Sequence, residues 1–244
     1  MKPEHTEVAN LHKYMRYHLQ GPTRFVQLQA EAGKLVRYLN SQGLKVIGKG
    51  APSAHVGRVI VDAVMQVRWR YGTHVRPRVR YIKNMYPKQA ATVSGLLGLI
   101  NSVGARNLLT NDKTERPWNG AEEQARLYKH ALFFYTKGID TFARLSNWLE
   151  SDWKSGSPEK NRDSLMELDG VAHKTADYYR VLVGNWDAFA VDKFMRGELL
   201  GRAGIDSDRY SYKEKRTVYQ LAAILMDVRP LDLDQSLYRY EIEQ

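Results

Sequence analysis

The sequence predicts an all-α fold, and three observations support this prediction. Apolar residues recur at spacings of three and four, as at Val56, Val59 and Ile60, which is the period of one face of an α-helix. Alternating patterns typical of strands are rare, and "LKVIG" at 44–48 is at best a short extended piece. Glycine, proline and polar residues separate the apolar segments at short intervals, as expected for connections between helices.

The turn signals place the boundaries of the individual helices. "QGPT" at 20–23 separates the first two, Pro77 is tolerated in the first turn of a fourth, and Gly138 divides two later ones. We expect connections at 110–120 ("TNDKTERPWNG") and 154–161 ("KSGSPEKN"). The expected helices span residues 7–19, 24–42, 55–71, 76–86, 89–101, 121–137, 140–153, 161–168, 173–184, 192–202 and 212–227, with a last one after Pro230.

The composition indicates a folded globular protein. Hydrophobic residues make up 43% of the 244 residues, which argues against disorder, and no apolar run approaches the roughly 18 residues of a membrane-spanning helix. The N-terminal residues, "MKPEHTEVANLHKYMRYHL", include acids and do not resemble a signal peptide. The chain has no cysteine, which excludes disulfides and cysteine-bound iron–sulfur clusters. We therefore expect an intracellular protein.

The positive charge is concentrated in one segment that also carries aromatic residues. The formal net charge is +10, and no acidic residue lies between Asp62 and Asp112. Basic side chains neutralise phosphates, and aromatic rings stack with bases, so this segment indicates nucleic-acid binding. The alternative is a solvated basic helix face with aromatic residues in the core. The expected phosphate contacts are Arg68, Arg70, Arg76, Arg78 and Arg80.

The segment "LMELDGVAHKTADYYRVL" at 165–182 predicts two helices joined by a tight turn around Gly170. Backbone amides at a helix N-terminus bind phosphate without side chains, so such a turn suits sequence-independent contact with DNA, although an ordinary helix corner has the same local pattern. Lys174 falls in the first turn of the second helix, where the helix dipole disfavours a cation. An amine that loses its proton easily is useful as a nucleophile.

A second motif, "FAVDKFMRGELL" at 189–200, contains Asp192, which follows Lys174 by 18 positions (192 − 174) and is a natural helix N-cap. Together the two motifs resemble the helix-hairpin-helix DNA glycosylase superfamily, the group that includes endonuclease III and the 8-oxoguanine glycosylases. Its signature is approximately Leu-Pro-Gly-Val-Gly-x-Lys-Thr-Ala, with Val-Asp about 18 residues after the lysine. The residues that match it are Leu168, Gly170, Val171, Lys174, Thr175, Ala176, Val191 and Asp192.

The resemblance implies two helical lobes with a DNA-binding cleft between them. The core domain would span 55–190 and contain the helix-hairpin-helix at 161–184, and the second lobe would be formed by 1–54 together with 191–244. It also implies a base-excision-repair DNA glycosylase with abasic-site lyase activity. Lys174 would attack the sugar C1′ to form a Schiff base, assisted by Asp192. The implied partner is double-stranded DNA with a damaged or mismatched base or an abasic site, bound by a monomer.

The resemblance further implies roles for the turn. Its DNA contacts would come from Gly170, Val171, Ala172, His173 and Thr175, and a structural monovalent cation would bind the backbone carbonyls of Leu168, Gly170 and Ala172. No other cofactor is expected, and the iron–sulfur cluster of endonuclease III-like relatives cannot form without cysteine. The chain departs from the family pattern at Asp169, where proline is usual, at Ala172, where glycine is usual, and at Lys193-Phe194, where Thr-His is frequent.

Recognition of the base stays open at the level of sequence. A glycosylase extrudes its target nucleotide and fills the gap. The candidates for filling the gap or lining the base pocket are Trp69, Arg70, Tyr71, Trp186 and Phe194, with Trp118, Tyr238 and Tyr240 also conceivable. Oxidised purines, oxidised pyrimidines and mismatched bases are all compatible, and the missing cluster favours 8-oxoguanine. Two other functions compete: a monofunctional glycosylase in which Asp192 activates water, and a non-enzymatic DNA-binding protein.

Overall fold

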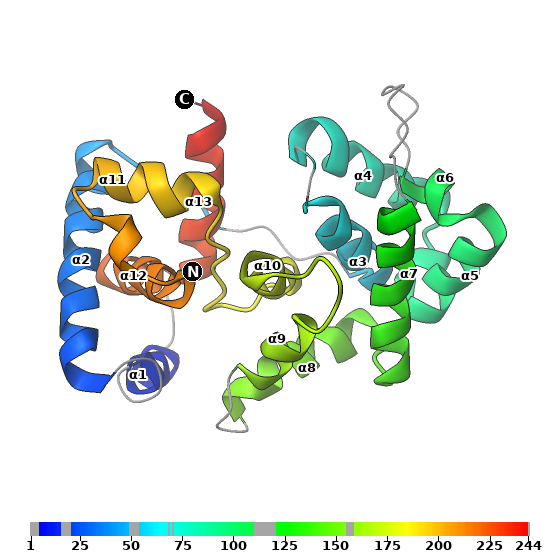
Figure 1. The fold of residues 1–244 in the computed structure, drawn as a ribbon, viewed down its shortest axis with the longest axis horizontal. Helices are drawn as coiled ribbons and strands as arrows, with labels where there is room; N and C mark the ends of the chain where they lie inside the picture. Colours follow the sequence, from blue (N-terminus) through cyan, green and yellow to red (C-terminus); the bar gives the residue numbers. More distant parts are fainter. Residues whose placement is uncertain are drawn as a thin grey trace. The chain divides into compact units, whose positions relative to one another are not determined.

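The computed structural model describes residues 5–15, 21–48, 54–67, 69, 71–109, 121–154 and 159–243. Within these ranges the regular structure is helical (Figure 1), and the only β-type pairing is an isolated bridge between Thr92 and Thr141. The all-α prediction is therefore confirmed for this part of the chain. None of the described helices is long and apolar enough to cross a bilayer.

The α-helices follow one another along the chain with short connections. Their bounds are α1 His5–Tyr14, α2 Gly21–Ser41, α3 Val56–Met65, α4 Arg76–Met85, α5 Val93–Val103, α6 Ala105–Leu109, α7 Ala121–Thr136, α8 Phe142–Lys154, α9 Lys160–Leu165, α10 His173–Val183, α11 Leu200–Arg202, α12 Tyr212–Leu225 and α13 Pro230–Glu243. Short 3₁₀ turns lie at Gln89–Ala91 and Ser207–Arg209, and π-helical turns at Tyr71–Val75 and Met195–Leu199.

The chain divides into two compact units. Unit 1 combines Met1–Ala51 with Trp186–Gln244, and unit 2 spans Pro52–Asn185. The sequence placed the corresponding boundaries between residues 54 and 55 and between residues 190 and 191. Lys174 belongs to unit 2, and Asp192 belongs to unit 1.

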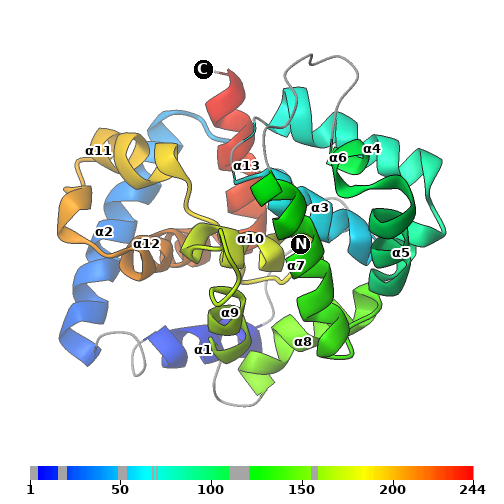
Figure 2. The same cartoon turned by 45° about the vertical axis from the view of Figure 1, so that its right-hand side comes forward.

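Unit 1 is built on the pairing of α2 with α12, which lie side by side in both views (Figures 1 and 2). The buried residues of α2, Leu28, Ala32, Leu35 and Leu39, recur every three or four positions and form one apolar stripe. A capping box of Ser211 and Glu214 begins α12. Arg24 of α2 donates from Nε to Oε1 of Glu214 at 2.6 Å, which ties the two helices together.

Unit 2 is organised around α3. Every residue of this helix except Arg58 is buried, because α4, α5, α7 and α10 all pack against it. A helix that is apolar on nearly all sides is stable only inside a core. The core also contains Leu96 of α5, Phe134 of α7 and Tyr179 of α10.

Two predicted helices differ from the structure, and one helix was not predicted. The helix predicted at 55–71 ends at Met65, and a π-helical turn at Tyr71–Val75 leads into α4. Trp69 and Tyr71, which follow the end of α3, both pack against the core. The helix predicted at 89–101 is a 3₁₀ turn followed by α5, and α6 was not predicted at all. Residues 44–48 form no strand.

Candidate functional site

The turn between α9 and α10 has the backbone geometry that its glycine permits. Gly170 adopts a φ of +77°, and a Cβ added there would lie 2.5 Å from Nε of Arg126 on α7. The next residue, Val171, is buried, and its N–H donates to the carbonyl of Leu168 at 3.0 Å. Ala172 has a φ of −103°, so alanine at this position carries none of the strain of a left-handed residue.

Lys174 is the second residue of α10, an eleven-residue helix whose N-terminus has no side-chain cap. The first amides of a helix have no intrahelical acceptor, so this end of α10 presents N–H donors and partial positive charge. The lysine side chain is half-buried. Within the described parts of the chain its amine makes no hydrogen bond or ion pair.

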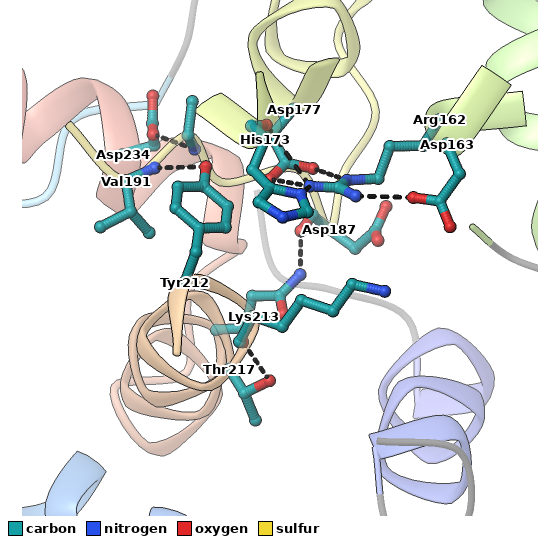
Figure 3. Close-up of polar contacts among 12 residues, drawn as sticks. Arg162, Asp163, His173, Asp177, Asp187, Val191, Tyr212, Lys213, Thr217 and Asp234 are labelled. Atoms are coloured by element: carbon teal, nitrogen blue, oxygen red, sulfur yellow. Dashed lines mark hydrogen bonds and ion pairs between the residues drawn. The ribbon is translucent and has the colours of Figure 1, made fainter. Parts of the chain in front are cut away.

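A buried ion pair fastens α9 to α10. The side chain of Arg162 is 0% exposed and donates from Nε to Oδ1 of Asp177 at 2.6 Å and from the Nη2 group to Oδ2 at 3.2 Å (Figure 3). The same guanidinium lies 3.1 Å from Nδ1 of His173, the first residue of α10, and also contacts Asp163. Since arginine only donates, Nδ1 of His173 is the acceptor, which leaves its ring proton on Nε2.

Asp169 pairs with cations of α7 at the start of the turn. Its carboxylate lies 3.9 Å from Nε of Arg126 and 3.7 Å from Nζ of Lys129. The acid at the position of the family's proline is therefore neutralised from within unit 2. Because Asp169 and Lys129 are each about half exposed, this arrangement contributes little to stability.

Beneath the turn lies a buried neutral histidine. Nδ1 of His130 and the hydroxyl of Tyr179 are 2.8 Å apart, and both side chains are almost fully buried. Burial lowers the pKa of His130 to about 4 and raises the pKa of Tyr179 above its usual value. Both groups therefore stay uncharged at neutral pH.

In unit 1 the residues just before Asp192 are buried and have no regular secondary structure, and side chains of α12 and α13 form hydrogen bonds with their backbone. Oδ1 of Asp234 accepts from the amide of Ala190 at 2.8 Å, and the hydroxyl of Tyr212 accepts from the amide of Val191 at 3.2 Å (Figure 3). Gln220 donates to the carbonyl of Asp187 at 2.7 Å. A buried segment without regular secondary structure needs such partners for its polar groups.

Asp192 occupies the N-cap position that the sequence predicts. Its Oδ1 accepts from the amide of Met195 at 2.8 Å, and its carbonyl accepts from the amide of Arg196 at 2.9 Å. The side chain is half-buried. Since only one carboxylate oxygen serves the cap, the second is available for another contact.

The basic residues predicted to contact phosphates separate into two groups. Arg76 and Arg80 are exposed on α4. Arg78 is 4% exposed and donates to the carbonyls of Leu108 and Asn107 at the end of α6, so its side chain is a structural link. Arg68 and Arg70 lie outside the described residues.

The aromatic candidates are partly buried in their own units. Trp69 lies 4.8 Å from the ring of His74 and packs against the core with Tyr71. Trp186 and Phe194 are half-buried in unit 1. Trp118 lies outside the described residues, and Tyr238 and Tyr240 are half-buried in α13.

Among the turn residues predicted to contact DNA, only some have side chains that solvent, and therefore DNA, can reach. Thr175 and Val171 are buried, whereas Ala172 is exposed and His173 is half-buried. The carbonyl of Leu168, one of the expected cation ligands, already accepts from Val171. The described residues contain no group of three or more His, Asp or Glu side chains arranged for a metal ion.

Sequence reasoning missed the residues that hold these elements. Arg162 and Asp177 are 15 positions apart, and Ala190 and Asp234 are 44 apart. The available signal was weak: Asp177 lies on the same side of α10 as its buried residues, where an unpaired acid is rare. Comparison of the chain with models of known families, with curated proteins and with solved structures found no match.

Proposed function

We propose that this protein is a base-excision DNA glycosylase with abasic-site lyase activity, acting on an oxidised base such as 8-oxoguanine in double-stranded DNA. Lys174 is the nucleophile and Asp192 the assisting carboxylate. The observation that carries the proposal is a half-buried lysine without a polar partner among the described residues, in the first turn of an uncapped helix. The resemblance of residues 165–192 to the glycosylase signature supplies the reaction.

The surroundings of Lys174 favour a nucleophilic amine. Some lysines of the protein pair with an acid, as Lys34 does with Glu31 at 2.9 Å. Lys174 instead follows a turn fixed by Gly170 and by the pairing of Arg162 with Asp177. Attack on a sugar carbon uses the nitrogen lone pair, and within the described residues Nζ of Lys174 is not engaged by an acid.

The proposed reaction uses an amine where a carboxylate cannot serve. The lone pair of Lys174 Nζ attacks C1′, the bond between C1′ and the base breaks, and the base leaves with the bonding electrons and takes up a proton. Loss of the amine proton and opening of the sugar ring give a Schiff base between Nζ and C1′. In the β-elimination, C2′ loses a proton, a double bond forms between C2′ and C3′, and the bond between C3′ and its oxygen breaks, so that the 3′ phosphate leaves. Water then hydrolyses the Schiff base and releases the lysine. The carboxylate of Asp192 stabilises positive charge on the sugar and transfers protons.

Borohydride trapping tests the nucleophile. The protein is incubated with a duplex containing an abasic site, or one containing 8-oxoguanine, and borohydride is added. We expect a covalent complex with the parent protein, its loss in Lys174→Ala, and its retention in the matched lysine variants Lys160→Ala and Lys193→Ala. Base release that survives Lys174→Ala without trapping would instead indicate a monofunctional glycosylase. DNA binding without any chemistry would leave only a binding protein.

Asp192→Asn separates chemistry from helix capping. Asparagine is as good an N-cap as aspartate, so the bond to the amide of Met195 is kept and the fold should be unaffected. Loss of the negative charge should slow single-turnover base release by about 100- to 1,000-fold, the usual effect of removing one electrostatic contact to a transition state. Unchanged base release would remove Asp192 from the proposed reaction.

A further inference from the structure

One exposed face of α4 carries a row of positive side chains. Arg76, Arg80 and Lys83 are all exposed and lie at positions i, i+4 and i+7, so they share one side of the helix. Seven residues of α-helix span about 10 Å. Three successive nucleotides of one DNA strand cover about the same length, at 3.4 Å per nucleotide. We call these three residues the α4 stripe.

Some exposed cations of the protein have an acidic partner, whereas the residues of the α4 stripe have none within the described residues. Lys34 pairs with Glu31, Lys129 with Asp169, and Arg202 with Glu198. In the described part of the chain none of the three stripe residues has an ion pair or a hydrogen bond. The sequence reinforces this contrast, because no acid occurs between Asp62 and Asp112. An uncompensated row of charge produces a local field that attracts a polyanion.

The helix that carries the stripe is fixed from its opposite side. Arg78 points inward, donates from Nε to the carbonyl of Leu108 at 2.5 Å, and lies over the ring of Tyr81 at 4.3 Å from its centroid. Val79 and Ile82 are buried in the core of unit 2. The stripe residues therefore extend from a rigid helix, and a partner need not order the backbone when it binds.

We infer that the α4 stripe binds the phosphate backbone of one strand of duplex DNA, outside the turn that precedes Lys174. The inference rests on the proposed function only for the choice of DNA as the polyanion. It assigns phosphate contacts to Arg76, Arg80 and Lys83 and a purely structural role to Arg78. Because the contacts are to phosphate, they add affinity without adding sequence preference.

Salt titration of DNA binding tests this assignment. The binding of an undamaged fluorescent duplex is measured by anisotropy between 50 and 300 mM KCl for the parent and for Arg76→Gln/Arg80→Gln/Lys83→Gln. The log–log slope should become shallower by about 2.7, at about 0.9 per lost phosphate contact, and affinity at 100 mM should fall on the order of 100-fold. Arg80→Gln alone should change the slope by about 0.9.

The control removes the same charge elsewhere in unit 2. Lys137→Gln/Arg144→Gln/Lys160→Gln replaces three exposed cations outside α4 and should leave the slope nearly unchanged. An unchanged slope in the α4 variant, or an equal change in the control, would overturn the inference. Thermal unfolding checks that each variant is folded, which we expect because every replaced side chain is exposed.

The trapping experiment tests the lyase chemistry and the salt titration tests the α4 stripe, so either proposal can be rejected while the other is supported. A shallower slope without any trapped adduct would support the α4 stripe and reject the proposed lyase chemistry. A trapped adduct with an unchanged slope would do the reverse. Binding to vesicles containing phosphatidylserine, lost in the α4 variant while DNA binding is unaffected, would also overturn the assignment to DNA.

Discussion

The turn before Lys174 and the segment before Asp192 are held by different kinds of interaction. In unit 2, charged side chains fasten helices around the turn, above all Arg162 with Asp177. In unit 1, single side chains such as Asp234 and Tyr212 pair the backbone of a segment without regular secondary structure. The turn is therefore stabilised by pairs of charged side chains that join two helices. The segment is stabilised by hydrogen bonds between individual side chains and its backbone amides and carbonyls.

This difference follows from the local backbone. Helix α10, with 11 residues, satisfies most of its own amides and carbonyls, so the side chains around it need only fix the angle at which α9 meets it. Residues 187–191 form neither helix nor sheet, and each buried polar group requires its own partner. Loss of one partner should therefore be severe in the turn, where a buried charge is left behind, and moderate in the segment.

The largest effect is expected for Arg162→Leu. This change leaves the carboxylate of Asp177, 1% exposed, in the core without its guanidinium. Breaking a buried pair from one side costs about 3–5 kcal/mol. Urea unfolding should show this loss, and the double variant Arg162→Leu/Asp177→Leu should recover most of it, because no unpaired charge remains. A double variant as unstable as the single one would mean that contacts of Arg162 with His173 and Asp163 dominate.

The turn should also weaken in acid through His130. Its pKa is about 4 in the folded protein and about 6.5 when unfolded, so the unfolded chain binds an extra proton between these values. Above pH 6.5 His130 therefore lowers the free energy of unfolding very little. As the pH falls toward 4, protonation of His130 in the unfolded chain lowers that free energy, by about 2.5 kcal/mol at pH 4.5. The free energy of unfolding at pH 7.5 and 4.5 measures this loss. The difference between the two pH values should shrink by that amount in His130→Phe, and an equal difference in both proteins would contradict it.

In the segment, Asp234→Ala should cost about 2 kcal/mol. It removes the acceptor of the buried Ala190 amide, and a hydrogen bond to a charged group contributes about 1.5–3 kcal/mol. Asp234→Asn keeps an acceptor oxygen and serves as the matched control. Hydrogen exchange of the Ala190 amide should accelerate in the alanine variant. If both variants were equally unstable, the charge of Asp234 would matter rather than this bond.

The smallest effect is expected for Gly170→Ala. A left-handed φ costs an L-residue about 1–2 kcal/mol, and the new methyl group would also displace the side chain of Arg126. Ala172→Gly, at an extended position two residues away, should cost less than 1 kcal/mol through backbone entropy alone. Urea unfolding compares the two. Equal losses would show that the left-handed conformation of Gly170 is not what the turn depends on.

Several features of the fold and site were predictable because they depend on neighbours in sequence. The apolar period of α2 and α3, the glycine before α10 and the N-cap at Asp192 are local properties, and the structure has all three. The end of α3 was predicted wrongly because the local apolar period continues to Val67, whereas the helix ends at Met65. The reaction assigned to Lys174 and Asp192 stays a prediction.

The sequence by itself determined an all-helical chain, a positively charged segment and the positions of Lys174 and Asp192 on their helices. Those features depend on composition and on spacings of a few residues. Only the tertiary structure decided that Arg78 is buried while Arg76 and Arg80 are exposed, and that Asp169 pairs with α7. Identical side chains on one helix differ in what packs against them, and the carbonyls that bind Arg78 come from Asn107 and Leu108, 29 and 30 positions away.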